Sequence, residues 1–128
     1  DIVVVSRYLG EAKSEDDTII SGFGNWMFSK MIRYLGKFPI TDALTLYKGY
    51  KSSIPKEKLF NKYLSTDLIF EPLLSAYSNL KGYKYAEIPG TEPARIGGES
   101  TLPWFKAGLC ISLFIVRLYV KKIFKITL

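Results

Sequence analysis

A glycine-rich loop near residue 95 combines residue types that bind anions. Arg95 stands just before Gly97 and Gly98, and Ser100 follows them. Glycines let the backbone approach a ligand closely and present its N–H groups. An arginine offers a fork of donors that suits phosphate oxygens, and a serine adds a hydroxyl group. The loop therefore predicts a phosphate site, and a Gly-Gly turn beside a solvated arginine is the alternative.

Three further polar residues stand where a ligand cleft of an α/β protein would form. Arg7 belongs to the tripeptide Ser-Arg-Tyr that ends an apolar, β-branched run. Ligands of open α/β sheets bind at the carboxyl ends of strands, so Arg7 can face a ligand; an ordinary surface charge is the alternative. Asp42 is an acid among apolar residues, and it either accepts backbone N–H bonds in a turn or faces the cleft. Glu87, near the end of a later predicted strand, is another candidate carboxylate.

The composition excludes several kinds of site. The 128-residue chain has the length of one domain, and its 48% hydrophobic content suffices for a packed core. It has no histidine, which removes every Ser-His triad, and Cys110 alone can form neither an intrachain disulfide nor a cysteine metal site. No metal ligands are predicted. The net charge of +6 indicates an anionic partner, namely phosphate, nucleic acid or an acidic membrane surface.

The order of the predicted elements is that of an α/β protein. A buried parallel strand opens the chain and Gly10 ends it. A helix follows from about residue 19 to Gly36, capped by Asp17 or Thr18, although Gly22 and Gly24 favour a later start. The remaining elements are an extended segment over 40–54, a short helix over about 55–64, a helix over 65–82, a strand over 83–89, and a loop over 87–104. In the helix over 65–82, Pro72 lies in the first turn or kinks the helix, and Gly82 is the C-cap.

The tail predicts one amphipathic helix over residues 107–125. Its apolar run is shorter than the roughly 20 residues that cross a bilayer. Arg117, Lys121 and Lys125 recur every fourth residue, with aliphatic residues on the opposite side. Such a helix is typical of an anionic membrane surface, and a helix packed on the domain is the alternative. Nucleic acid is disfavoured, because these lysines accompany aliphatic rather than aromatic residues.

Five segments, in this order, resemble the second half of family 2 glycosyltransferases with the GT-A fold, and most closely the dolichyl- and polyprenyl-phosphate sugar transferases. Residues 1–10 resemble the family strand that ends in Ser-Arg-Tyr or Ser-Arg-Phe. The other matches are a helix over 20–35 with Ser21 and Asn25 in place, the Asp-containing segment over 40–54, a helix, glycine and strand over 70–89, and Arg-x-x-Gly-x-Ser over 95–100. The chain departs from the family at Asp16 and Asp17, where a basic pair is frequent, and at Thr101, where a lysine is usual.

The resemblance implies an α/β fold, the acceptor-side half of a GT-A (Rossmann-like) domain over residues 1–106, followed by the amphipathic helix over 107–128. Because the chain opens directly on a strand, we expect it to be a piece of a longer protein that lacks the first half of the domain and is inactive alone. A divalent metal, Mg²⁺ or Mn²⁺, and a nucleotide-sugar donor are implied, with ligands in the missing half.

The implied activity is that of an inverting glycosyltransferase of the hexosyltransferase type. It would move a sugar to a lipid-linked, polyprenyl-phosphate-like acceptor or to a cell-surface glycan, as a cytoplasmic enzyme peripheral on the inner face of the cell membrane. Catalytic residues stay unassigned. The residues expected to bind the phosphate of the acceptor are Arg7, Arg95, Gly97, Gly98, Ser100 and Ser21, with Asp42 as a cleft acid and with Arg7 and Arg95 facing one cleft. A non-catalytic basic module that binds anionic lipid is the rival hypothesis.

Overall fold

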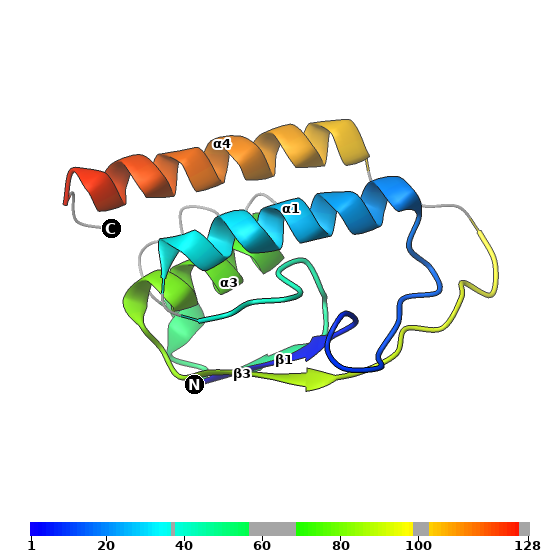
Figure 1. Cartoon of the computed structure of the whole chain (residues 1–128). Helices are drawn as coiled ribbons and strands as arrows, with labels where there is room; N and C mark the ends of the chain where they lie inside the picture. The colour runs from blue at the N-terminus through cyan, green and yellow to red at the C-terminus, as the bar shows by residue number, and fades with distance from the viewer. Residues whose placement is uncertain (37, 57–68, 99–102, 126–128) are drawn as a thin grey trace.

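A three-stranded mixed sheet forms one side of the protein, and the helices are stacked on it (Figure 1). The structure is a computed structural model, and it describes residues 1–36, 38–56, 69–98 and 103–125. The strands are β1 (Ile2–Ser6), β2 (Lys48–Tyr50) and β3 (Tyr85–Pro89), in the order β2-β1-β3. β1 pairs antiparallel with β2 and parallel with β3. The carboxyl ends of β1 and β3 therefore lie side by side, and we call this place the carboxyl edge.

The central strand is buried on one face only. Ile2 and Val4 point into the core, whereas Val3 between them is 44% exposed. A strand buried on both faces, as the apolar run predicts, would need a covering layer on each side. The described helices cover only one side of the sheet (Figure 1).

Helix α1 (Ile19–Leu35) packs against α3 (Phe70–Lys81) and α4 (Trp104–Ile123). It begins at Ile19, as the helical spacing predicts, and not later as Gly22 and Gly24 would favour. The Thr18 side chain accepts from the backbone of Ser21, and the Ser21 hydroxyl accepts from the backbone of Thr18, which satisfies two N–H groups of the first turn. This capping box offsets the roughly 1 kcal/mol that a glycine costs in a helix.

Helix α3 (Phe70–Lys81) ends as predicted and carries its proline where predicted. Pro72 lies in the first turn, where a missing N–H is tolerated. Gly82 follows the helix with φ 73°, the left-handed conformation that favours glycine at a C-cap. In the region of the predicted helix over 55–64, the structure describes only a 3-10 turn, η1 (Ile54–Lys56); the rest lies outside the described residues.

Helix α4 (Trp104–Ile123) lies on α1, on the side away from the sheet, and runs in the same direction (Figure 1). It begins before the predicted residue 107 and ends before Lys125, which has a φ of 50° and lies outside the helix. Hydrogen bonds join the helices: the Tyr119 hydroxyl donates to the Met31 carbonyl at 2.6 Å, and Lys122 Nζ donates to the Leu35 carbonyl at 2.7 Å and to the Tyr34 carbonyl at 3.3 Å.

One hydrophobic core joins β1 to the helices. It contains the inner face of α4, which consists of Ala107, Ile111, Phe114, Ile115 and Leu118. All of these but Ala107 belong to the same buried cluster as Ile2 and Val4 of β1. Residues on both sides of the predicted boundary at 106 thus share a core, and the boundary itself stays a prediction.

Candidate functional site

Arg7, directly after β1, is the centre of an ion-pair cluster at the carboxyl edge. Its guanidinium makes a two-pronged contact with Asp42, from Nε to Oδ2 at 2.7 Å and from Nη2 to Oδ1 at 3.0 Å. Nη1 donates to Glu92 Oε2 at 2.9 Å, and Asp17 lies 3.9 Å from the same nitrogen. We call Arg7, Asp17, Asp42 and Glu92 the Arg7 cluster. It joins chain segments that lie up to 85 residues apart.

Asp42 is fully buried and holds the backbone as well as the guanidinium. It accepts from the Arg7 amide at 3.2 Å and from the Thr45 amide at 3.1 Å. Of the two roles left open by the sequence, Asp42 therefore has the turn role, and its carboxylate is directed at Arg7. Burial by itself lowers the pKa of Arg7, but the hydrogen bonds and charge of Asp42 and the bond to Glu92 outweigh it and raise that pKa, so Arg7 stays charged.

Glu87 of β3 fastens the segment that carries Asp42. Its carboxylate accepts from the Thr41 amide at 2.9 Å, from the Thr41 hydroxyl at 2.6 Å, and from the Asp42 amide at 3.4 Å. The Ser6 hydroxyl lies 2.6 Å from the Thr41 hydroxyl. The parallel pairing of β1 with β3 brings Ser6 and Glu87 close enough to hold this segment between them.

Arg95 lies in the loop that follows β3 and binds an acid from the loop that follows β1. Its Nε and Nη2 donate to the two oxygens of Asp16 at 3.2 and 2.9 Å. The pair raises the pKa of Arg95 and lowers that of Asp16, and the Arg95 side chain is 40% exposed. Glu92 adds backbone bonds to the same loop, from its amide to the Lys13 carbonyl at 2.9 Å and from the Glu15 amide to its carbonyl at 3.0 Å.

Both arginines thus lie at the carboxyl edge, but each binds carboxylates, so a phosphate site shared between them stays a prediction. The physical reason lies in the departures from the family pattern: Asp16 and Asp17 put negative charge beside the arginines, where a basic pair is frequent in the family. Ser21 caps α1, and its hydroxyl also lies within hydrogen-bond reach of Asp17, at 3.0 Å.

The glycines of the loop are exposed and open to solvent. A Cβ placed on Gly97 or Gly98 would meet no atom within 4 Å, and Gly98 has a φ of 78° that favours glycine. Ser100 lies outside the described residues.

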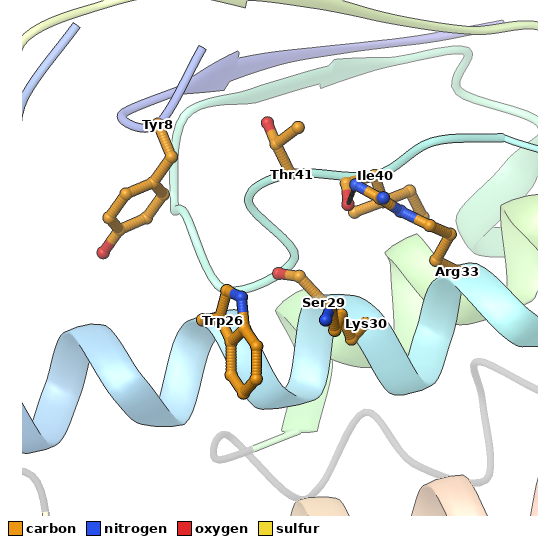
Figure 2. A pocket seen from close by; sticks show the side chains of 7 residues that line it. All are labelled: Tyr8, Trp26, Ser29, Lys30, Arg33, Ile40 and Thr41. Atoms are coloured by element: carbon orange, nitrogen blue, oxygen red, sulfur yellow. Dashed lines mark hydrogen bonds between the residues drawn. The ribbon is translucent and has the colours of Figure 1, made fainter.

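A pocket of about 240 Å³ lies between α1 and the sheet-side segments (Figure 2). It is lined by Trp26, Ser29, Lys30 and Arg33 of α1, by Tyr8 after β1, and by Ile40 and Thr41 before β2. We call it the α1 pocket. None of these residues was predicted for the site, although Trp26, Lys30 and Arg33 have the i, i+4, i+7 spacing of one helix face.

Two groups at the rim of the α1 pocket link it to the Arg7 cluster. The Tyr8 hydroxyl donates to Asp17, and burial, followed by this bond, raises the pKa of Tyr8. Thr41 is the neighbour of Asp42 and binds Glu87. The pocket and the carboxyl edge are therefore parts of one region.

The described residues do not fit a metal site. No group of three or more histidine, cysteine or acidic side chains that could hold an ion is found among them. The divalent metal implied by the resemblance has no ligand set in the described part of the chain, and no chemical step is derived through it.

The side of α4 that faces away from α1 is apolar as well. Its residues repeat at spacings of three and four, which places them on one stripe. The stripe, which we call the outer face of α4, consists of Phe105, Leu109, Leu113, Val116, Val120 and Ile123, each between 44% and 73% exposed. Arg117 and Lys121 flank it. None of the helices within the described ranges is long and apolar enough to cross a bilayer.

Comparison of the chain with protein-family models, with curated proteins and with solved structures finds no match. The fold is a mixed α/β fold with a small three-stranded sheet and, within the described residues, three α-helices. The glycosyltransferase resemblance rests on the sequence segments alone.

Proposed function

We propose that this chain is the acceptor-side half of an inverting glycosyltransferase of the GT-A fold. The enzyme would move a sugar from a nucleotide-sugar to a lipid-linked, polyprenyl-phosphate-like acceptor or to a cell-surface glycan. It would work on the cytoplasmic side of the cell membrane, as a peripheral protein. The chain alone would be inactive, and the donor and the divalent metal would be held by residues outside it.

One observation supports this proposal above the others: the segments that carry the resemblance meet at the carboxyl edge. Arg7 of the Ser-Arg-Tyr tripeptide binds Asp42 of the third segment (40–54), and Glu87 of the fourth (70–89) holds Asp42 in place. Asn25 of α1 accepts from the Leu44 amide at 3.1 Å, and so joins the same group. Ligands of α/β sheets bind at this edge.

The proposed chemistry needs no histidine. A phosphate acceptor is already ionised near neutral pH, so no general base has to remove its proton. Acceleration would come from placing the acceptor and from balancing its charge. In this arrangement Asp42 is a positioning residue, because its carboxylate holds Arg7 and the backbone. Arg95, on an exposed loop of the same edge, is the arginine that can turn towards an acceptor.

A second function, lipid binding without catalysis, is favoured by the outer face of α4. Large apolar side chains along one stripe, flanked by Arg117 and Lys121, suit a surface of anionic head groups. In the leading proposal the same face brings the enzyme to a lipid-borne acceptor. In the rival hypothesis, lipid binding through this face is the whole function of the chain.

The test uses the complete gene product that contains these residues. It is incubated with radiolabelled nucleotide-sugars, one at a time, and with lipid extract, and the organic phase is counted. Label in the organic phase supports the leading proposal. Absence of transfer with every donor, together with retained binding to anionic vesicles, would favour the lipid-binding module.

A further inference from the structure

The α1 pocket has a charge balance opposite to that of the neighbouring carboxyl edge. Lys30 and Arg33 line it, and no carboxylate does among the described residues. At the carboxyl edge, by contrast, Arg7 and Arg95 are each matched by acids. A concave site with two cations and no acid attracts an anion.

Lys30 and Arg33 both have N–H groups that can donate to a ligand. Lys30 Nζ lies 4.4 Å from the centre of the Trp26 ring, and no ion pair joins it to a described acid. Arg33 uses Nη2 to donate to the Ile40 carbonyl at 3.1 Å, which fixes the guanidinium and leaves its other N–H groups. Ser29 Oγ accepts from the Ala43 amide at 2.9 Å, so its own proton can serve a ligand.

The size and the lining residues of the pocket limit the kind of ligand that it can bind. Its volume of about 240 Å³ lies below the roughly 300–1,000 Å³ of pockets for drug-sized ligands. That is room for a head group and too little for a nucleotide-sugar. Arginine and lysine together, with a hydroxyl beside them, are donors that suit phosphate oxygens. Figure 2 shows Ser29 and Arg33 extending from α1 towards the segment of Ile40 and Thr41, with Lys30 beside Ser29 and with Tyr8 across from the helix.

We propose that the α1 pocket binds a phosphate ester, with Lys30 and Arg33 as its charged donors. This inference rests on the proposed function only in taking the sugar acceptor as the source of the phosphate. The same chemistry could come from a lipid head group or from a free sugar phosphate, and binding measurements separate the two.

The experiment is calorimetric titration of the complete gene product with glucose 1-phosphate, and with glucose as the control ligand. The double variant Lys30→Gln/Arg33→Gln should weaken glucose 1-phosphate binding by about tenfold or more, because each lost charge-assisted bond is worth about that much. Lys81→Gln is the matched control, because Lys81 also lies over an aromatic ring, 5.5 Å from that of Tyr77, on another helix. Thermal melts verify that each variant is folded. Equal binding of glucose and glucose 1-phosphate, or an unchanged double variant, would overturn the inference.

Vesicles of phosphatidylcholine with and without phosphatidic acid identify the source. If the double variant loses both soluble and vesicle binding, the pocket takes a lipid phosphate; if it loses only soluble binding, the pocket takes a free phosphate ester. Loss of neither contradicts the inference. The proposed function can fail separately: pocket binding without sugar transfer would refute the glycosyltransferase, and sugar transfer with binding insensitive to the double variant would refute only the pocket.

Discussion

Replacing Asp42 should remove a large part of the protein's free energy of unfolding. The Asp42 carboxylate is fully buried, and it accepts four N–H bonds, three from Arg7 and one from Thr45. Asp42→Asn keeps the shape but removes the charge, and it turns an N–H group towards the donors. Breaking a buried ion pair on one side costs about 3–5 kcal/mol, because the remaining charge stays buried without compensation. Domains of this size are stable by only about 5–15 kcal/mol.

The assay is urea unfolding followed by circular dichroism for the wild type, Asp42→Asn, Arg7→Met and the double variant. Each single variant should lose about 3–5 kcal/mol of unfolding free energy. The double variant should lose less than the sum, by about 0.5–3 kcal/mol, because the two residues act as one unit. Lys51→Ala is the control: it breaks the exposed pair with Asp1 and should change the free energy by less than about 1 kcal/mol. A loss below about 1 kcal/mol for Asp42→Asn, or strict additivity, would refute the reasoning.

Three other predictions concern two glycines, the buried Lys48 and the basic residues of the tail. Gly36→Ala should destabilise the protein by about 1–3 kcal/mol, because a Cβ there would clash with the Asn79 carbonyl oxygen. Gly24→Ala should stabilise it by about 0.5–1 kcal/mol, because the space around Gly24 is open. Chemical denaturation measures both changes in the free energy of unfolding. Burial lowers the pKa of Lys48 to about 7 from an ordinary 10.5, so the folded state binds fewer protons than the unfolded state between these values. The unfolding free energy should therefore rise with pH from about 7 to 10.5, by up to about 1.4 kcal/mol per pH unit, and Lys48→Met should lack this rise if the lysine causes it. Changing Arg117 and Lys121 of α4, and Lys125 just after it, to Glu should weaken binding to anionic vesicles by about 1 kcal/mol for each residue. Unchanged sedimentation with the vesicles would show that these residues form a merely solvated face.

The sequence predicts those parts of the fold that depend on local signals. The Thr18 cap of α1 and the Gly82 end of α3 are encoded within a few residues, and β3 follows from alternation between Tyr85 and Pro89. The start of α1 near residue 19 was predicted from the helical spacing, and the capping box explains why Gly22 does not delay it. Helix propensity alone does not include that gain.

The partners of the site residues could not be predicted from local signals. Arg7 is recognisable as a strand-end arginine, but its contacts with Asp42 and Glu92 span 35 and 85 residues. They depend on which strands pair, and in which direction. When the strand pairing is not known, an arginine that binds an acid cannot be distinguished from one that is available to bind a phosphate.

The tail shows the same limit in its packing. The run from Ala107 to Val120 is apolar on several sides, and its sequence does not say which side meets the domain. The structure places Ile115 and Leu118 in the core and leaves Leu113 and Val116 exposed. The packed helix is confirmed for one face, and binding of the exposed face to a membrane surface stays a prediction.

The most direct test of the acceptor site compares Arg95→Ala with Asp16→Asn. In this structure the two residues bind only each other through their side chains, within the described part of the chain. If Arg95 serves the acceptor, Arg95→Ala should cut transfer of labelled sugar to lipid extract by roughly a hundredfold, and Arg95→Lys should recover only part of it. Asp16→Asn frees the guanidinium, so it should transfer at the wild-type rate or faster, and all three variants should melt like the wild type. Equal losses of activity in Arg95→Ala and Asp16→Asn would contradict the account, because Arg95 would then act only by joining the two loops.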